Sequence, residues 1–238
     1  MRLLFIAFLL FHLPVSAQQG LVLTGTKNDT IATPADTLYR EDQMYASIAY
    51  NLLQGKPRDF SQNSFSSSFT IGFLRDMPIN KARTYAVAAG LGYAYNNIKY
   101  NLKISGADGG GYGYEVIPEN LFSRNKLVLH YAELPVELRW RDSNPLSHQF
   151  WRVYLGFKVS FLLADNAEFE SGEETIKIKG NNDLNRFMYG AYIAAGWNTW
   201  NLYAYYGLNP IFKSSATLPG GESIDLYSVN FGLMFYIL

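Results

Sequence analysis

The most regular pattern in the chain is an alternation of apolar and polar side chains between residues 131 and 163. Successive side chains of a β-strand point to opposite faces, so alternation predicts strands with one apolar face. Here the apolar positions are Leu134, Val136, Leu138, Trp140, Trp151, Val153, Leu155, Phe157, Val159, Phe161 and Leu163. The opposite face carries charged or small residues. Such a hairpin fits a soluble sheet with its charges outside, or a membrane barrel with its charges in the lumen.

The rest of the chain predicts a total of eight strands. We place them at 44–53, 65–74, 84–103, 187–197, 200–212 and 224–238, with a central hairpin at 126–163 that turns at 142–149. The connections alternate in length: they are long at 54–64, 104–125, 165–184 and 214–223, and short at 77–83, 142–149 and 198–199.

This alternation of loop lengths distinguishes between the two interpretations of the hairpin, a soluble sheet and a membrane barrel. Outer-membrane barrels have an even number of antiparallel strands, short periplasmic turns and longer external loops. A soluble sandwich has no reason to sort its loops in this way, and a soluble up-and-down barrel keeps its large apolar residues inside. We therefore predict an all-β fold, an eight-stranded antiparallel up-and-down transmembrane β-barrel.

The tryptophans agree with this prediction, because all four flank predicted short turns. They are Trp140, Trp151, Trp197 and Trp200. Tryptophan concentrates at membrane–water boundaries, where its ring is in apolar surroundings and its N–H finds a partner. We expect these residues to form an aromatic girdle at the periplasmic interface. The alternative is that they are four ordinary core residues.

The N-terminal region predicts export. Residues 1–17 combine a charged start at Arg2, an apolar core and a small-residue cleavage site, which is the pattern of a signal peptide. Residues 18–42 are polar, without periodicity, and are predicted to form a flexible periplasmic leader. Residues 43–238 would then be the outer-membrane barrel domain, and the cell outer membrane is the expected location.

Composition narrows the function classes. The 238 residues carry no net charge and no cysteine. A basic patch for nucleic acid is therefore not expected, and disulfides, thiolate metal sites, thiol nucleophiles and a lipid-modified cysteine are excluded. His130 and His148 have no second His at metal-ligand spacing. No G-x-S-x-G motif is present, and the glycines at 109–113 lack the Lys and Ser/Thr of a phosphate loop. We predict no enzyme activity, metal, cofactor or small-molecule substrate.

The charges of the central hairpin are predicted to have a structural role. Two carboxylates four positions apart on a strand lie about 13 Å apart, which is too far for an acid–base pair acting on one bond. Buried charges must be paired. We therefore predict a lumen ion-pair network formed by Glu133, Glu137, Arg139, Arg152 and Lys158.

The C-terminal strand carries a polar-x-Gly-x-x-aromatic-x-apolar pattern, formed by Asn230, Gly232, Phe235 and Ile237. This is the kind of signal that the barrel-assembly machinery of Gram-negative bacteria reads. The terminal Leu238 departs from the aromatic residue with which such barrels often end. The expected partners are therefore this machinery and the lipid of the outer membrane.

Residues 131–141 and 150–158 resemble the core hairpin of PorT-type outer-membrane barrels of Bacteroidetes, and 197–210 and 232–238 are similar as well. The resemblance implies the barrel fold. It also implies an accessory role in the type IX secretion system, with other components of that system as partners. The alternative is a small structural or adhesive barrel that acts through its extracellular loops. An open channel is disfavoured, because side chains just fill the interior of eight strands.

Overall fold

A computed structural model describes residues 42–238, with gaps at 63, 108–109, 143–150 and 238. The predicted signal peptide, most of the predicted leader, His148 and the terminal Leu238 lie outside the described residues. Asp42, which we assigned to the leader, is the first residue of the first strand and forms an ion pair with Arg75 at 3.1 Å.

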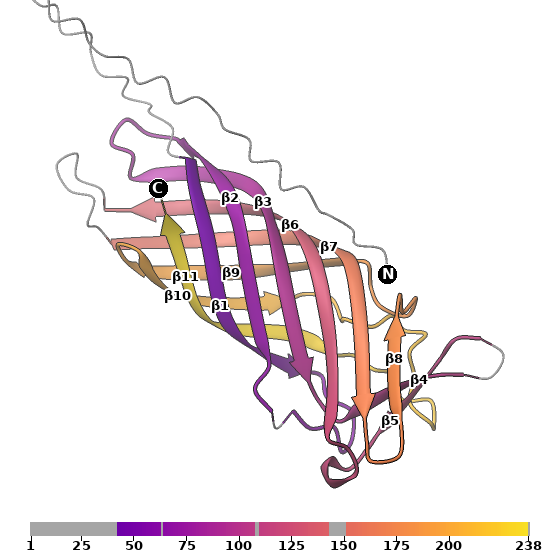
Figure 1. The fold of residues 1–238 in the computed structure, drawn as a ribbon. Coiled ribbons are helices and arrows are strands. Elements are labelled where there is room, and N and C mark those ends of the chain that lie inside the picture. Colours follow the sequence, from indigo (N-terminus) through magenta and orange to yellow (C-terminus); the bar gives the residue numbers. More distant parts are fainter. Residues whose placement is uncertain (1–41, 63, 108–109, 143–150, 238) are drawn as a thin grey trace, which may run out of the picture. The chain divides into compact units, whose positions relative to one another are not determined.

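Eight antiparallel strands form a closed barrel within the described part of the chain (Figure 1). They are β1 (Asp42–Gln54), β2 (Ser67–Pro78), β3 (Tyr85–Lys99), β6 (Arg124–Arg141), β7 (Trp151–Glu170), β9 (Phe187–Trp197), β10 (Trp200–Gly207) and β11 (Tyr227–Ile237). Each strand pairs with the next of these along the chain, and β11 pairs with β1 to close the ring. The predicted eight-stranded up-and-down barrel is confirmed.

The barrel has two different ends. The connections 79–84 and 198–199, together with the end of β6 at Arg141 and the start of β7 at Trp151, lie at one end, which we call the short-turn end. The connections 55–66, 100–123, 171–186 and 208–226 lie at the other, which we call the long-loop end.

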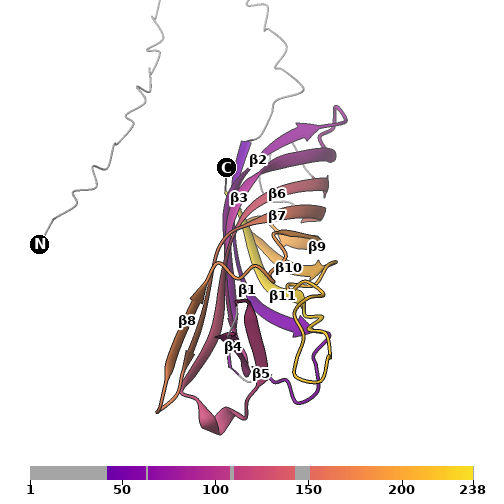
Figure 2. The same ribbon diagram turned by 90° about the vertical axis from the view of Figure 1, so that its right-hand side faces the viewer.

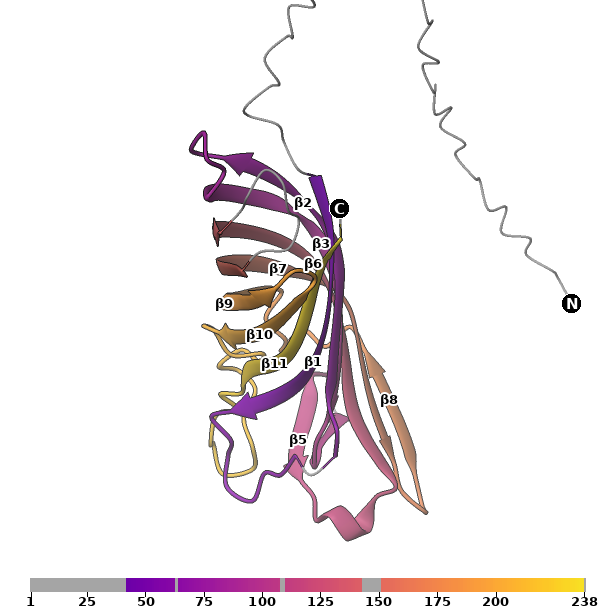
Figure 3. The same ribbon diagram turned by 90° about the vertical axis from the view of Figure 1, so that its left-hand side faces the viewer.

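Two of the long connections are more ordered than we expected. The connection 100–123 contains the hairpin of β4 (Leu102–Gly106) and β5 (Tyr112–Val116) and a short 3₁₀ turn, η1 (Glu119–Leu121), so the strand that we predicted at 84–103 is interrupted after Lys99. The stretch 165–184 contains the end of β7 and β8 (Thr175–Lys179), which pairs with it. Figures 2 and 3 show β4, β5 and β8 at the same end of the barrel. Within the described residues, no helix is long and apolar enough to cross a membrane.

A shift of register explains why β7 was predicted too short. The pairing of β6 with β7 slips between His130 and Tyr131, so that His130 pairs with Ala164 and Tyr131 with Leu162. An extra residue in one strand exchanges the two faces beyond it. Beyond the slip, Ala167 and Phe169 turn inward, and the alternation that we followed to residue 163 continues in the opposite phase.

The last two strands were predicted too long. β10 ends at Gly207 instead of residue 212, and β11 begins at Tyr227 instead of residue 224. Their apolar flanks are not strand. They are loop residues packed in a core at the long-loop end, which contains Ile211, Phe212, Ile224 and Leu226. Apolar sequence beside a strand is therefore used here for packing between loops.

The faces of the strands are arranged as expected for a membrane barrel. Leu138 and Leu155 are 61% and 56% exposed on the outside, whereas Glu137 and Arg139 are 0% and 2% exposed inside. The outward apolar row of β7 runs from Trp151 to Leu163, about 40 Å along the strand. At a tilt of about 45° this corresponds to about 28 Å along the barrel axis, close to the thickness of a bilayer core.

Candidate functional site

The short-turn half of the lumen contains a buried charge cluster. Arg139 of β6 donates from Nε to Glu137 at 2.7 Å and from Nη1 to Asp76 of β2 at 2.8 Å. Arg141 pairs with the other oxygen of Asp76 at 3.0 Å. Gln43 of β1 accepts a further hydrogen bond from Arg139 at 3.0 Å. The buried guanidinium of Arg139 thus links three strands of the barrel, β1, β2 and β6.

Tyrosine hydroxyls complete the coordination of Glu137. Tyr192 of β9 and Tyr236 of β11 each donate to its Oε1, at 2.7 and 2.9 Å. The rings of Tyr154 and Tyr236 also lie 4.7 and 5.4 Å from the Arg139 guanidinium carbon, which adds cation–π contacts. Glu137 therefore accepts three hydrogen bonds, and the strands that supply them lie on opposite sides of the lumen.

A second ion pair lies nearer the middle of the barrel. Lys158 of β7 pairs with Glu133 of β6 at 2.8 Å, and the Ser160 hydroxyl donates to the same carboxylate at 3.3 Å. The Lys158 ammonium also lies 4.5 Å from the centre of the Tyr205 ring of β10.

The structure brings the five predicted lumen residues together in part. Glu133 pairs with Lys158, and Glu137 with Arg139, but these are two separate groups. Arg152 is buried in the lumen, where its guanidinium lies 5.8 Å from the ring of Tyr154. The role of these residues in the cell stays a prediction.

Several lumen residues were missed by the sequence analysis. Asp76 was left out because we ended its strand at residue 74, although it shares the inward face of Ser68 and Thr70. Extending the alternation by one step would have placed it in the lumen. The inward tyrosines were missed because tyrosine also suits the lipid interface. The alternation places Tyr192, which faces inward, on the opposite face from Tyr189, which faces outward, but the residue type alone did not mark Tyr192 as a lumen residue.

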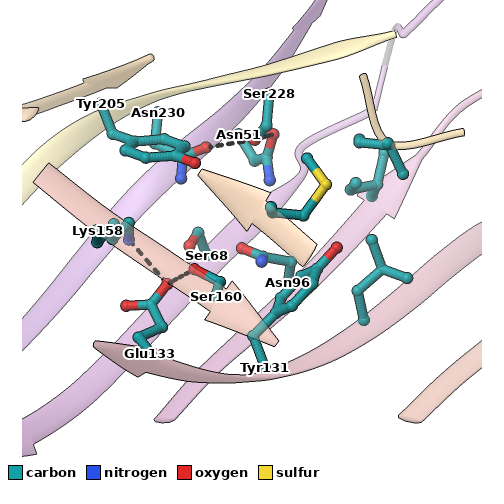
Figure 4. A pocket seen from close by; sticks show the side chains of 14 residues that line it. Asn51, Ser68, Asn96, Tyr131, Glu133, Lys158, Ser160, Tyr205, Ser228 and Asn230 are labelled. Atoms are coloured by element: carbon teal, nitrogen blue, oxygen red, sulfur yellow. Dashed lines mark hydrogen bonds and ion pairs between the residues drawn. The ribbon is translucent and has the colours of Figure 1, made fainter. Parts of the chain in front are cut away.

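Between the mid-lumen ion pair and the long loops lies a small polar cavity of about 30 Å³ (Figure 4). Its labelled lining includes the Lys158–Glu133 pair on one side and Asn51, Ser228 and Asn230 on the other. The Ser228 hydroxyl donates to Asn51 at 3.1 Å. A cavity of this size has room for about two water molecules. At this volume it is too small for a solute.

An apolar core, which we call the cap, seals the long-loop half of the lumen. It joins strand residues such as Leu127, Leu129 and Tyr131 of β6 to loop residues such as Phe212 and Leu226. In this half our expectation of a small or charged inner face was wrong. The cap packs like the core of a soluble domain, because the loop segments bring apolar side chains to cover the inner face of the strands.

A lumen filled in this way should not conduct ions. We expect the purified protein to give no steady conductance in planar bilayers under conditions in which a porin control gives open steps. The physical reason is that the charge cluster and the cap lie one above the other along the lumen. Open steps that increase in number with protein concentration would contradict this prediction.

The four tryptophans all lie at the short-turn end and face outward, between 38% and 64% exposed. The rings of Trp151 and Trp197 are 5.4 Å apart in an edge-to-face contact. Trp197 is also the register partner of Trp200 across the turn at 198–199. Their function as a membrane girdle stays a prediction.

The four residues of the predicted assembly signal lie on β11. Asn230 faces the lumen, and Ile237 faces outward. Phe235 contacts the ring of Trp200 at 5.1 Å. At Gly232 the backbone of β1 passes so close that an added Cβ would lie 2.0 Å from the carbonyl oxygen of Ile48. Packing against the closing strand therefore already requires glycine at this position.

A cluster of ion pairs joins the extension of β7 to its neighbours. Glu168 forms ion pairs with Lys126 of β6 at 2.9 Å and with Lys177 of β8 at 3.6 Å. The hydrogen bond from Lys126 is the main cause of a lowered pKa of Glu168; burial opposes it, and the charges of Lys126, Lys177 and Arg124 lower the pKa further.

This lowered pKa predicts that the β7–β8 extension loosens in acid. A carboxyl with a depressed folded-state pKa contributes stability above its unfolded pKa, near 4.5, and loses it as the pH falls through the folded value. We expect amide hydrogen exchange in 166–179 to become faster below about pH 4 than in the strands near the short-turn end, after both rates are corrected for the intrinsic pH dependence of exchange. Glu168→Gln should show much less of this dependence. Equal pH dependence in the variant and the wild type would contradict the assignment.

His130 lies on the outer wall, where its Nδ1 is 2.5 Å from the Tyr93 hydroxyl. No group of three or more His, Cys, Asp or Glu residues that could hold a metal occurs in the described part of the chain.

Comparisons with known proteins agree with this geometry. The model of a family described as "Outer membrane protein beta-barrel domain" matches residues 26–213. No curated protein matches the chain. Among solved structures, a triple mutant of Rh. blastica porin covers 84% of this chain and 100% of its own, at 8% identity and a TM-score of 0.21. That score is too low to support any argument about the fold. The family match spans well over half of the sequence, so the chain belongs to the outer membrane protein β-barrel domain family.

Proposed function

We propose that this protein is a non-conducting outer-membrane barrel that serves as an accessory of type IX protein secretion. The absence of conduction is supported by one observation, which is that the lumen is sealed. The buried charge cluster around Arg139 and the apolar cap lie in series, and the chamber between them measures about 30 Å³. A protein of this kind acts through its outer wall, its long loops or its turns, because nothing of useful size passes through it.

The secretion role rests on the sequence resemblance to PorT-type barrels. The resembling residues 131–141 and 150–158 form parts of β6 and β7, which contain the lumen residues Glu133, Glu137, Arg139 and Lys158. A likeness there supports a shared barrel type. In the proposed role the barrel assists export by contact with other secretion components, while a different protein forms the conduit.

One observation favours the alternative of a structural or adhesive barrel. The long-loop end carries an ordered layer of β4, β5 and β8 packed on the cap, instead of extended polar loops. Ordered loops suit a binding surface, because less conformational entropy is lost on binding.

Deleting the gene in its bacterium tests the two roles together. The secretion role predicts that signal-bearing cargo disappears from the medium, that the outer membrane stays intact, and that the wild-type gene restores export. Normal export combined with altered surface binding would support the adhesive role and reject the secretion role.

The expected orientation places the long-loop end outside the cell and the short-turn end in the periplasm. The chain has no cysteine, so single cysteines can be introduced without background. A cysteine at Gly172, between β7 and β8, should react with a membrane-impermeant maleimide in intact cells. One at Lys81, in the turn between β2 and β3, should react only after lysis. A tag inserted at 142–149 should likewise be shielded. The opposite result would reverse the orientation.

A further inference from the structure

The outer wall has a seam where β7 exchanges one neighbour for another. β7 pairs with β9 as far as Phe161 opposite Phe187, and with β8 from Asn166 opposite Lys179. Between these pairings the Leu162 N–H donates to the Arg186 carbonyl at 2.8 Å. Figure 2 shows β8 extending beyond the barrel wall. The seam contains a hollow of about 320 Å³.

Two exposed cations line this hollow, and neither has an ion-pair partner within the described residues. They are Lys179, the last residue of β8, and Arg186, which directly precedes β9. The lining also includes the carboxylate of Asp165. This group is buried and accepts a hydrogen bond from the Asn181 backbone N–H at 3.0 Å, so one of its oxygens is already bound within the protein.

The surroundings of the hollow are cationic as well. Arg124, Lys126 and Lys177 share the outward face beyond the seam, and all three are within 3.6 Å of Glu168, which is the acceptor common to them. Arg124 also pairs with Glu170 at 3.5 Å. Together with Lys179 and Arg186 these cations outnumber Asp165, Glu168 and Glu170, the carboxylates that pair with them or line the hollow, so this part of the wall has a local excess of positive charge.

The seam lies at the edge of the apolar belt. Leu163 ends the outward apolar row of β7, is 56% exposed, and also lines the hollow. Lys179 lies opposite Asn166, three residues beyond Leu163. At about 3.3 Å per residue and a tilt of about 45°, this places it about 7 Å beyond the belt along the barrel axis. That height corresponds to the headgroup layer of a bilayer.

We propose that this hollow binds a phosphorylated glycolipid of the outer leaflet. The phosphate lies between Arg186 and Lys179, and an acyl chain follows the apolar surface of Leu163 and its row. Arginine and lysine recognise phosphate by charge-assisted hydrogen bonds, which are strong in partly apolar surroundings. The cations sit beside the lipid-facing surface, so a lipid reaches them without leaving the membrane. This binding does not depend on a role in secretion, but the choice of an outer-leaflet lipid rests on the proposed orientation, with the long-loop end outside the cell.

The test is a titration of the purified full-length protein in detergent micelles with diphosphoryl lipid A, followed by native mass spectrometry. We expect the double variant K179Q/R186Q to bind about tenfold more weakly than the wild type or worse, because two cations at the headgroup layer are lost. The matched control is K56Q/R58Q. It removes two exposed cations at the same end of the barrel, in the loop after β1, which lies across the ring from β7. This control should bind like the wild type.

Two further arms separate the sources of phosphate. Dephosphorylated lipid A should bind the wild type and K179Q/R186Q equally weakly, and millimolar inorganic phosphate should not displace the diphosphoryl form. The proposal fails if K179Q/R186Q binds as tightly as the wild type, if the control loses as much, or if removing the phosphates leaves binding to the wild type unchanged. Displacement by inorganic phosphate would show a site for free anions and would also reject it. The comparison of diphosphoryl and dephosphorylated lipid A on the wild-type protein tests the proposal even if the double variant does not fold.

Discussion

Replacing Glu137 by alanine is expected to destabilise the folded barrel by about 3–5 kcal/mol, the range for removing one partner of a fully buried ion pair. Glu137 is 0% exposed and accepts hydrogen bonds from Arg139, Tyr192 and Tyr236. The truncation leaves two hydroxyls and one guanidinium N–H without their acceptor. Arg139 keeps Asp76, which must then balance both Arg139 and Arg141.

The measurement is urea unfolding of purified protein folded into lipid vesicles, followed by tryptophan fluorescence. Glu173→Ala is the matched control, since Glu173 is an exposed carboxylate in the turn between β7 and β8. Its change should stay within about 0.5 kcal/mol, as for most surface substitutions. If Glu137→Ala unfolded at the wild-type urea concentration, the lumen would have to be hydrated around residue 137, and the buried cluster described above would be incorrect.

Placing an arginine on the lipid face should have an effect that depends on depth. Val159 lies in the outward row of β7, opposite Leu134 of β6 and Tyr189 of β9. Four residues separate it from Leu163 and eight from Trp151, so it lies well inside the apolar belt. Val159→Arg should cost about 2–4 kcal/mol there, whereas the same charge near an interface costs about 0–1 kcal/mol.

Trp151→Arg supplies the comparison at the short-turn boundary. It also removes the ring contact with Trp197, so we expect a cost slightly above the interfacial range but below that of Val159→Arg. Both variants should be folded into vesicles and unfolded in urea. Equal and severe losses would indicate that this face is buried against protein. Complete folding of the wild-type chain in buffer without detergent or lipid would contradict the membrane barrel itself.

The sequence by itself determined the barrel and its inside-out character. An alternation of period two is a local property, and each strand such as 187–197 shows it without help from any other segment. The same alternation predicted eight strands, and the alternating loop lengths predicted that the barrel has two different ends. The charges at Glu133, Glu137, Arg139 and Lys158 were placed inside because they share a face opposite the large apolar residues.

Only the tertiary structure decided which charges meet. Glu137 and Arg139 are two residues apart on β6, but their common environment comes from Asp76 on β2, Tyr192 on β9 and Tyr236 on β11. Those contacts depend on the register of strands far apart in the sequence and on ring closure. A local pattern contains no information about either, so the pairings could not be read from it.

The cap and the seam also depend on the tertiary structure and could not be predicted from the local pattern. The slip between His130 and Tyr131 reverses the faces of β7 beyond Leu163 and turns Phe169 inward, and on its other edge this part of β7 pairs with β8 instead of β9. Loop residues such as Phe212 then complete an apolar core. The sequence carries only a change in the phase of the alternation after Leu163; which segments this part of β7 meets depends on packing between segments that come together only when the barrel is closed.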